Sequence, residues 1–575
     1  MSDAAATEAR GAARVAVIGA GTMGRGIAQL ALQAGHVVTL VEPNASTAAS
    51  ASTALHDLFE RLAAKGRLDE TPSALLDRLT LAGDVTAAAG ADWVIEAVPE
   101  DLRLKRELFA RLAEVAPRAR LATNTSTLSV TAIAAGCARA EDVIGMHFFN
   151  PPRLMRLVEV VPGVETRASL VTEAVVFARQ LGREPVVAQD SPGFIVNRLA
   201  RPYYLEALRL HAEGVPLATC DAAMRAAGFA MGPFELLDLI GLDVNLASSE
   251  SVYQAFYQEP RYRPHPLQRR MVEAGLLGRK VGRGFYRYDE RGRRLDSDER
   301  EPRPRDAAAL IGPGTTVDGR SDADARPRPA VEVLGDGPVA EALRAHLPPI
   351  PVGAQADIIL DAGMQPASQP GRTAANGGQL LVLAWGRSAS TATEALLGTG
   401  KAPEGAATHH GRSVLGFSVV PGARSDSARL TLELLAPPSQ EAAEAAGRAA
   451  TVLEAAGVTV LHVPDQPGGV AFRLVALLVN EAVTALAEGL AVKEDLDTAM
   501  RLGVNYPLGP LEWGERLGLA NVLAALDSLH RETGAARFAP HPLLRRLVAM
   551  GRTTFTTPSD QQPPPTDPLS DTMEQ

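Results

Sequence analysis

The stretch GMHFFNPPRLMRLVEV contains a histidine and an acid, His147 and Glu159, on what its pattern indicates are two strands joined by a proline turn. A histidine backed by a carboxylate can act as a general acid and base, because the carboxylate orients the ring and stabilises its cation. The alternative is a structural histidine with satisfied hydrogen bonds, since sequence spacing does not show that the two side chains touch. The pair is a candidate proton-transfer site.

A glycine-rich stretch, VAVIGAGTMGRG, places Gly19, Gly21 and Gly24 after a predicted strand and at a helix start. The first glycine permits a tight turn, the second lets the backbone approach a pyrophosphate, and the third lets the helix pack close to the sheet. Glu42 ends the next strand, where an acid binds a ribose 2′-hydroxyl. These features predict a dinucleotide site, and the acid favours NAD over NADP. A purely structural glycine turn is the alternative.

Two further stretches, NTSTLS and DSPGFIVNR, could contact a substrate. The first follows a strand at the expected carboxyl edge of the sheet, so Asn124 and its neighbouring hydroxyls could face a ligand. Its alternative role is a helix cap made by Ser126 or Thr127. In the second stretch, Asn197 is expected about one turn into a helix, where its amide could bond a substrate carbonyl or merely bridge two elements.

The elements that must position these residues form two kinds of domain. From residue 14 to about 189, apolar strand-like runs alternate with helical runs, which predicts a parallel sheet with helices on both faces. From 191 to about 280 the strand signals vanish, and segments such as NRLARPYYLEALRLHAEG and GPFELLDLIG predict helices ended by glycine. A Rossmann-type α/β domain is thus followed by an all-α domain.

The same order of motifs recurs in the second half of the chain. AVEVLGDGPVAEALRAHL imitates RVAVIGAGTMGRGIAQLAL, and DQPGGVAFR imitates DSPGFIVNR. In the second copy Ala340 stands for the third glycine, Ser418 for His147 and Phe472 for Asn197, while Glu433 matches Glu159. We therefore interpret the chain as one duplicated two-domain unit whose second copy is degenerate and structural. Its helical domain is expected to pack on the first as an internal pseudo-dimer.

Composition excludes several classes of function. The net charge of −10 leaves no basic footprint for nucleic acid, and no apolar run reaches the ~18–20 residues of a membrane span. The first residues carry acids and no apolar segment, which does not fit a secretory signal. Only Cys137 and Cys220 occur, which fits a reducing cytoplasm. No metal site is predicted.

Taken in order, the motifs GxGxxG, NTSTLS, MHFFNPP…LVEV, DSPGFIVNR, MGPFELLD and GRKVGRGFYRY resemble those of the L-3-hydroxyacyl-CoA dehydrogenase family, over residues 14 to 288. The resemblance implies a Rossmann NAD-binding domain followed by the all-α C-terminal domain of that family. It also implies NAD-dependent oxidation of an L-3-hydroxyacyl-CoA. His147 would take the proton of the 3-hydroxyl, Glu159 would support His147, and Ser126 and Asn197 would orient the substrate.

The resemblance also implies the contacts to ligands. The cofactor positions carried over are Gly19, Gly21, Gly24, Glu42, Glu100, Lys105 and Asn124. Lys65, in RLAAKGRL, matches a stretch that contacts coenzyme A phosphates, with a solvated helix face as the alternative. The predicted divisions are a disordered tail (1–13), the NAD-binding domain (14–190), a helical substrate and dimerisation domain (191–288), a linker (289–330), a degenerate Rossmann-like domain (331–464), a second helical domain (465–552) and a disordered tail (553–575).

The duplication narrows the resemblance. NRLARPYYLEA and LIGLDVNLASSESVYQAFYQEPRY look like the long tandem bacterial forms linked to phenylacetate breakdown, which act on 3-hydroxyadipyl-CoA or 3-hydroxybutyryl-CoA. Two other readings stay open: an NAD- or CoA-binding protein without turnover, and a dehydrogenase of a free hydroxy acid. The internal pseudo-dimer allows either a monomer or a further homo-oligomer.

Overall fold

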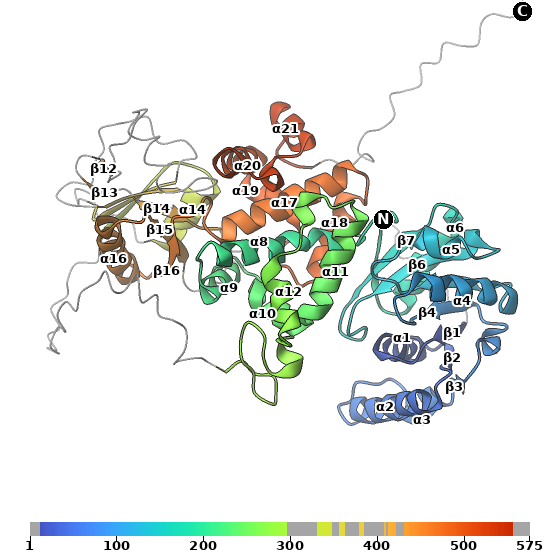
Figure 1. Cartoon of the computed structure of the whole chain (residues 1–575). Coiled ribbons are helices and arrows are strands. Elements are labelled where there is room, and N and C mark those ends of the chain that lie inside the picture. The colour runs from blue at the N-terminus through green and yellow to red at the C-terminus, as the bar shows by residue number, and fades with distance from the viewer. Residues whose placement is uncertain are drawn as a thin grey trace, which may run out of the picture.

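The computed structural model describes residues 12–295, 330–347, 356–362, 379–383, 408–409, 412–413, 415–420 and 430–555. Two α/β units lie on opposite sides of a central group of helices (Figure 1). Residues 1–11, 296–329 and 556–575, which hold most of the predicted tails and linker, lie outside the described residues. Phe555, which falls in the predicted C-terminal tail, is buried, and its N–H donates to Glu515 Oε1 at 2.8 Å.

The first unit contains an eight-stranded sheet in the order β3-β2-β1-β4-β5-β6-β7-β8. Its strands are β1 (Arg14–Ile18), β2 (Val37–Val41), β3 (Leu79–Ala82), β4 (Trp93–Glu96), β5 (Arg120–Thr123), β6 (Val143–Phe148), β7 (Leu157–Pro162) and β8 (Glu184–Val187). The predicted parallel sheet includes one antiparallel pair, β6 and β7, which are the two strands that the proline turn joins. The connection 149–156 is too short for a parallel crossover, so the chain turns back beside the strand it has just left.

Helices cover both faces of this sheet. They are α1 (Thr22–Gln33), α2 (Ala45–Ala63), α3 (Pro72–Leu76), α4 (Leu102–Val115), α5 (Val130–Ala134) and α6 (Ala168–Gln180), with short 3-10 turns η1 (Val85–Ala88) and η2 (Ala140–Asp142). Successive residues of a strand point to opposite faces, and β1 accordingly sends Ala16 and Ile18 into one apolar cluster and Val15 and Val17 into the other. This explains why the strands appear in the sequence as continuous apolar runs.

The first helical domain begins directly after β8. Its elements are α7 (Val196–Leu199), α8 (Arg201–Ala212), α9 (Leu217–Ala226), α10 (Pro233–Ile240), α11 (Leu242–Ala255) and α12 (Pro266–Glu273), with 3-10 turns η3 (Pro260–Tyr262) and η4 (Arg279–Val281). The single helix predicted for 197–214 is divided into α7 and α8, but Ala200 between them keeps a right-handed helical conformation. The side chains of the two segments therefore follow one helical face.

The second α/β unit has a six-stranded sheet in the order β16-β15-β14-β11-β10-β9, and a separate pair, β12 (Thr408–His409) and β13 (Arg412–Ser413). Its other elements are β9 (Val331–Leu334), α14 (Pro338–His346), β10 (Ile358–Asp361), β11 (Gln379–Leu383), β14 (Leu415–Ser418), β15 (Thr431–Ala436), α16 (Gln440–Ala455) and β16 (Thr459–Pro464). β9 corresponds to β1, yet it lies at the sheet edge. In the described part of this unit no strand takes the places of β2 and β3.

The second helical domain comprises α17 (Ala471–Ala487), α18 (Lys493–Gly503), α19 (Pro510–Leu517), α20 (Leu519–Thr533) and α21 (Pro542–Ala549), with the 3-10 turn η6 (Ala536–Phe538). Its long α17 packs against α8 of the first helical domain (Figure 1). Two buried ion pairs join the domains: Arg198 Nε to Glu481 Oε1 at 2.8 Å, and Arg473 Nε to Glu206 Oε1 at 2.6 Å. These four residues correspond pairwise in the duplication, so each domain offers its partner the same arginine and the same glutamate.

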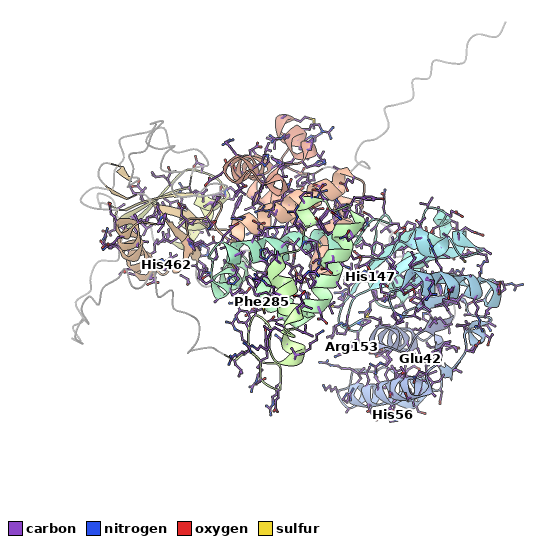
Figure 2. All side chains as sticks on the ribbon, viewed as in Figure 1. Glu42, His56, His147, Arg153, Phe285 and His462 are labelled. Atoms are coloured by element: carbon purple, nitrogen blue, oxygen red, sulfur yellow. The ribbon has the colours of Figure 1, made fainter. Side chains whose placement is uncertain are left out.

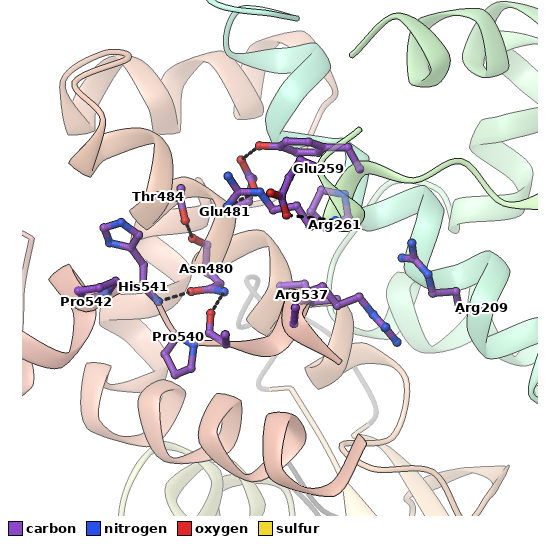
Figure 3. Close-up of a pocket in the computed structure, with 15 residues that line it drawn as sticks. Arg209, Glu259, Arg261, Asn480, Glu481, Thr484, Arg537, Pro540, His541 and Pro542 are labelled. Atoms are coloured by element: carbon purple, nitrogen blue, oxygen red, sulfur yellow. Dashed lines mark hydrogen bonds and ion pairs between the residues drawn. The ribbon is translucent and has the colours of Figure 1, made fainter. Parts of the chain in front are cut away.

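A cavity of about 240 Å³ also lies between the two helical domains (Figure 3). Its charged walls include Arg261, Glu481 and Arg537. Arg261 Nη1 lies 3.7 Å from Glu481, and Arg537 Nε lies 2.7 Å from Glu206, so the walls pair with glutamates of the interface. None of the residues predicted to be catalytic lines this cavity.

Candidate active site

The register of β6 and β7 places His147 directly opposite Glu159. His147 Nδ1 and Glu159 Oε2 are 2.6 Å apart, and both side chains are buried. Figure 2 shows His147 on the side of the first α/β unit that faces the helices. The antiparallel pairing therefore supplies the contact that sequence spacing alone could not establish.

Glu159 has a second set of partners at the start of the helical domain. Its Oε1 accepts hydrogen bonds from the N–H groups of Ile195 at 3.0 Å and Val196 at 2.9 Å. A carboxylate that accepts from Nδ1–H of a neutral histidine leaves the lone pair of Nε2 available for a proton. The arrangement is that of a general base whose ring is fixed by an acid, and the same acid anchors the first turn of α7.

Two aromatic rings, which the sequence interpretation did not single out, flank the imidazole. The His147 ring centroid lies 4.4 Å from that of Phe149 and 6.0 Å from that of Phe194. Phe194 has φ of 47°, a conformation that residues other than glycine rarely adopt. Such strain is concentrated at functional sites. No signal in the sequence marks this conformation, although the Phe follows the Pro-Gly pair of the domain junction.

Glu100 organises the loop 124–129. Its Oε1 accepts from Thr125 Oγ1 at 2.6 Å and from the N–H of Ser126 at 2.9 Å, and its Oε2 lies 3.1 Å from Lys105 Nζ. Burial raises the pKa of Glu100, but Lys105 and these hydrogen bonds outweigh it and lower the pKa to about 2. Glu100 is therefore ionised at neutral pH and holds the loop that presents Ser126. The cap of α5 is Ser129, which accepts from the N–H of Ala132 at 3.1 Å, and not Ser126 or Thr127.

Asn197 lies against this loop. Its Nδ2 donates to the carbonyl of Ser126 at 3.3 Å, and its Oδ1 accepts from Ser248 Oγ at 3.4 Å. Asn197 is the second residue of α7, so the expectation that it lies one turn into a helix is wrong by most of a turn. Asn124 Oδ1 accepts from the N–H of Phe148, next to His147, at 2.9 Å. Four predicted positions, Ser126, His147, Glu159 and Asn197, are thus linked through one network of loop, strands and helix.

The glycine-rich turn has the geometry that its spacing predicts. Gly19 has φ of 101°, and a Cβ there would lie 2.8 Å from the Ala97 carbonyl oxygen. A Cβ on Gly24 would lie 1.8 Å from the Gly19 carbonyl oxygen. Gly21, at the N-cap of α1, has open space where its Cβ would be and no side-chain cap. The N–H groups at the start of α1 are consequently accessible to an anion.

The remaining predicted ligand positions are exposed to different degrees. Glu42 is fixed at the end of β2, where its two oxygens accept from the N–H groups of Ala20 at 3.0 Å and Asn44 at 3.1 Å. Lys105 is buried, with Nζ 2.8 Å from Glu96 Oε1, so it supports the loop from behind rather than lining an open face. Lys65 is exposed in the turn that follows α2, beyond the end of the helix.

Glu96 is a buried acid that the sequence interpretation missed. It accepts from Lys105 Nζ and from Thr123 Oγ1 at 2.6 Å and the N–H of Val98 at 2.7 Å. An acid at the end of the apolar run WVIE was the signal that could have identified it. Among the described residues, no cluster of three or more His, Cys, Asp and Glu side chains is arranged to hold a metal ion.

The second unit repeats this framework without the histidine. Ser418 lies opposite Glu433 in the pairing of β14 with β15, and Glu433 accepts from the N–H groups of Val470 at 2.7 Å and Ala471 at 2.8 Å. A Cβ on Gly469 would lie 2.2 Å from Glu433 Oε2 and 2.9 Å from Ser418 Cβ, so backbone occupies the space around the acid. Phe472 is fully buried at the position of Asn197.

Comparisons with known proteins agree with this duplication. The sequence profile described as "3-hydroxyacyl-CoA dehydrogenase, NAD binding domain" matches residues 14–191. The profile described as "3-hydroxyacyl-CoA dehydrogenase, C-terminal domain" matches twice, at 193–288 and 468–559. In the part of the chain that the structure describes, no helix is both long and apolar enough to cross a membrane.

Individual relatives match over different lengths. The chain is 37% identical to the 3-hydroxyadipyl-CoA dehydrogenase of Escherichia coli strain K12, over 93% of this chain and 97% of that protein. It is 40% identical to the mitochondrial hydroxyacyl-coenzyme A dehydrogenase of Rattus norvegicus, over 48% of this chain and 90% of that one. A crystal structure of 3-hydroxybutyryl-CoA dehydrogenase from Escherichia coli K12 superimposes with a TM-score of 0.73 at 37% identity, covering 94% of this chain and 99% of that chain.

Proposed function

The chain belongs to the 3-hydroxyacyl-CoA dehydrogenase family of NAD-dependent enzymes, and on this premise we propose that residues 14–288 hold its single active site. The reaction is the oxidation of an L-3-hydroxyacyl-CoA to the 3-oxoacyl-CoA. The observation that carries the assignment of the site is the buried contact of 2.6 Å between His147 and Glu159. We keep the predicted divisions of the chain, including the second unit at 331–552, as part of this proposal, except that Phe555 packs with the second helical domain.

In this proposal His147 is the general base. Its Nε2 accepts the proton of the substrate 3-hydroxyl, while Nδ1–H stays bonded to Glu159. The imidazolium that forms is stabilised by the adjacent carboxylate, which lowers the free energy of the transition state. Phe149 and Phe194 exclude water from the ring, and this strengthens the interaction between the charges.

Ser126 and Asn197 orient the substrate. The hydrogen bond from the Asn197 amide to the Ser126 carbonyl brings both residues to one place, on opposite sides of the junction between the sheet and the helices. Glu100 fixes the backbone of Ser126, so the Ser126 hydroxyl starts from a defined position. Holding the 3-hydroxyl in this geometry lowers the entropic part of the barrier.

The residues of the glycine turn fit NAD. Gly19, Gly21 and Gly24 leave the N-terminus of α1 open to a pyrophosphate, and Glu42 stands at the end of β2 for a ribose hydroxyl. When bound, NAD supplies the acceptor for the hydride from C3. Asn124 supports the adjacent strand end through Phe148, and Lys105 keeps Glu100 ionised. Lys65 remains our candidate for contact with the phosphates of coenzyme A.

For the substrate we propose a short 3-hydroxyacyl-CoA, either 3-hydroxyadipyl-CoA or 3-hydroxybutyryl-CoA. The long curated relative is named for 3-hydroxyadipyl-CoA and the long solved structure for 3-hydroxybutyryl-CoA, and these names support the two acyl chains. If the substrate were not a CoA ester, the enzyme would oxidise a free hydroxy acid. If the chemistry were wrongly assigned, the protein would bind its ligands without turnover.

We propose that the second unit is structural and that the two helical domains form an internal pseudo-dimer. The loss of the histidine and the described sheet without counterparts of β2 and β3 support the first statement. The reciprocal arginine–glutamate pairs support the second. Unpaired Cys137 and Cys220 are in keeping with our expectation of the cytoplasm.

The test is NADH formation by the full chain with 3-hydroxybutyryl-CoA, 3-hydroxyadipyl-CoA and free 3-hydroxybutyrate. We expect turnover of the CoA esters only, and we expect His147→Gln to lower kcat by about 10²–10⁴-fold, the usual contribution of a general base. The matched change in the second unit, Ser418→Ala, should leave kcat unaltered. Loss of activity in the Ser418 variant with retention in the His147 variant would refute the assignment.

A further inference from the structure

Arg201 is a buried cation without an acidic partner, one helical turn beyond Asn197. Its side chain is only 3% exposed. Its Nε donates to the Asn197 carbonyl at 2.7 Å, and its Nη1 donates to Ser249 Oγ at 2.7 Å and to the Asn245 carbonyl at 3.5 Å. Every one of these acceptors is neutral, and no Asp or Glu of the described residues forms an ion pair with Arg201. A guanidinium in this position lacks the counter-charge that buried arginines normally have.

The other buried arginines of this helical layer show the contrast. Arg198 pairs with Glu481 and Glu488, and Arg473 pairs with Glu206 and Glu213. For Arg201, burial lowers the pKa of the guanidinium, and the nearby Tyr204 and Tyr506 oppose this loss of hydration only in part. The fold thus supplies acids to its interface arginines and leaves Arg201 without one.

The duplication shows that the scaffold does not need this charge. Aligning GPFELLDLIGLDVNLASSE with GPLEWGERLGLANVLAALD places Val522, Ala525 and Leu526 at the positions of Asn245, Ser248 and Ser249. Arg201 itself corresponds to Ala476. These four replacing residues are fully buried in the second unit: Ala476, Val522, Ala525 and Leu526. The degenerate copy therefore packs the same helices with apolar side chains, and the polar set accompanies the active copy alone.

A buried hydroxyl in the same cluster comes from the other unit. The hydroxyl of Tyr506, in the loop between α18 and α19, is buried and has no hydrogen-bond partner among the residues that the structure describes. Its ring lies 5.5 Å from that of Tyr203, while the Arg201 guanidinium lies over Tyr204 at 5.4 Å. Burial raises the pKa of Tyr506 well above its ordinary range, and the nearby Arg201 charge opposes this. Two buried donors without an anion therefore face one region.

The position of Arg201 fits the far end of a short acyl chain. Residues four apart on a helix share a face, so Arg201 follows Asn197 by one turn of about 5.4 Å. In a six-carbon chain the terminal carbon is three bonds from C3, a reach of roughly 4 Å at about 1.5 Å per bond. The partners of Arg201 on α11, Asn245 and Ser249, are 2% and 0% exposed, whereas Val244 on the neighbouring face of the helix is 54% exposed. Ser248, which bonds Asn197, is only half-buried.

We propose that Arg201 binds the distal carboxylate of a dicarboxylic 3-hydroxyacyl-CoA and that the Tyr506 hydroxyl, supplied by the second unit, completes this subsite. The proposal rests on the proposed function, because it places the reacting carbon at His147. It selects the dicarboxylic ester from the two substrates considered above. It also gives the second unit a direct part in substrate recognition. A carboxylate there would supply the anion that Arg201 lacks, through a charge-assisted and bidentate contact.

The experiment compares two six-carbon substrates that differ only at the far end: 3-hydroxyadipyl-CoA and 3-hydroxyhexanoyl-CoA. The wild-type enzyme should prefer the dicarboxylic ester in kcat/KM by at least about tenfold. In Arg201→Met the ratio of the two kcat/KM values should fall by ~10–100-fold, mainly through KM for the dicarboxylic ester, as expected for loss of a buried charge contact. Tyr506→Phe should lower the same ratio a few-fold.

Arg153→Met is the matched control, because Arg153 follows the catalytic strand and is exposed; it should leave the ratio unchanged. If Arg201→Met does not fold, the double change Arg201→Ala with Ser249→Leu copies the packing of the second unit. A wild type without preference for the dicarboxylic ester, or an equal loss on both substrates, would overturn the subsite. A wild type inactive on both esters would instead overturn the proposed function.

Discussion

Comparison of the two units separates two roles of one residue type. Glu159 contacts both His147 and the first N–H groups of α7, whereas Glu433 keeps only the contact with the start of α17. Retention of the acid where the histidine is lost indicates that this glutamate first serves to fix the helical domain against the sheet. The catalytic use that we propose for it in the first unit would be added to that structural contact.

The Glu433 carboxyl predicts a pH dependence of stability. Burial raises its pKa from 4.5 to about 7, against the effect of the Val470 and Ala471 N–H groups. Glu433 ionises at a lower pH in the unfolded chain than in the folded one. The stabilisation that the protonated carboxyl gives the folded chain is therefore fully present below pH 4.5 and is lost as the pH rises through 7. The free energy of unfolding of Glu433→Gln should therefore rise relative to that of the wild type across this window, by up to ~3 kcal/mol.

Urea unfolding at several pH values measures this difference. The exposed residue Glu441 offers a control, since Glu441→Gln should track the wild type. A constant offset between wild type and the Glu433 variant from pH 4.5 to 8 would contradict the prediction.

At the level of single residues, the sequence was informative where chemistry restricts the residue type. His147, Glu159 and the three glycines could be proposed as site residues because few residue types can do such work. Phe194, Glu96 and the Ser129 cap could not, since their roles depend on local backbone conformation and on contacts between distant segments. Arg201 escaped notice because arginine is abundant in the chain and its lack of an acid is visible only in three dimensions.

Among the elements, the turn from β1 into α1 predicts the clearest effect on the cofactor. A Cβ on Gly24 would meet the Gly19 carbonyl oxygen at 1.8 Å, which forces the helix away from the strand. Gly24→Val should abolish measurable NAD binding. Gly21, where a Cβ meets nothing in the protein, should tolerate Ala in folding but bind NAD more weakly.

Fluorescence titration with NADH, together with thermal unfolding, distinguishes these outcomes. Equal NADH affinity in the Gly24 variant and the wild type would show that the cofactor does not lie on this turn. The matched substitution in the second unit, Ala340→Val, should leave NADH affinity unchanged.

Strands and helices were predictable because buried strands need continuous apolar runs and helices end at glycine. The antiparallel pairing of β6 and β7 follows from their short, proline-containing connection, which is too short for a parallel crossover. The division of one predicted helix into α7 and α8 does have a signal in the sequence: Pro202, at the start of α8, has no N–H to continue the helical hydrogen bonds of α7.

At the scale of the whole molecule, Glu206 is a buried acid at the interface between the two helical domains. It is fully buried and contacts Arg473, Arg209 and Arg537. Burial raises its pKa, but these arginines outweigh that effect and lower the pKa to about 2. Glu206→Gln should reduce the free energy of unfolding by about 3–5 kcal/mol, because it leaves buried arginines without a counter-charge.

Denaturant unfolding at neutral pH checks this value. Glu250→Gln, which breaks an exposed pair with Arg269, should cost about 0–1 kcal/mol and serves as the control. Similar losses in the two variants would show that the interface does not depend on the buried pairs. The stabilisation from Glu206 should also disappear as the pH falls below 4.5 toward 2.

The order of the domains could be predicted from repeated motifs, since a duplicated sequence preserves its own sequence of elements. The reciprocity of the ion pairs could not, because it arises from how two copies face each other in space.

That reciprocal contact has a consequence for how the enzyme responds to dilution. Two separate subunits joined by such a face dissociate as their concentration falls, and their stability changes with it. Here both faces belong to one chain, so each meets its counterpart at a fixed effective concentration. The tether also removes the requirement that the two faces stay identical. Tyr262 can donate to Glu481 at 2.5 Å on one side while Phe538 stands in its place on the other, an asymmetry that a homodimer cannot acquire.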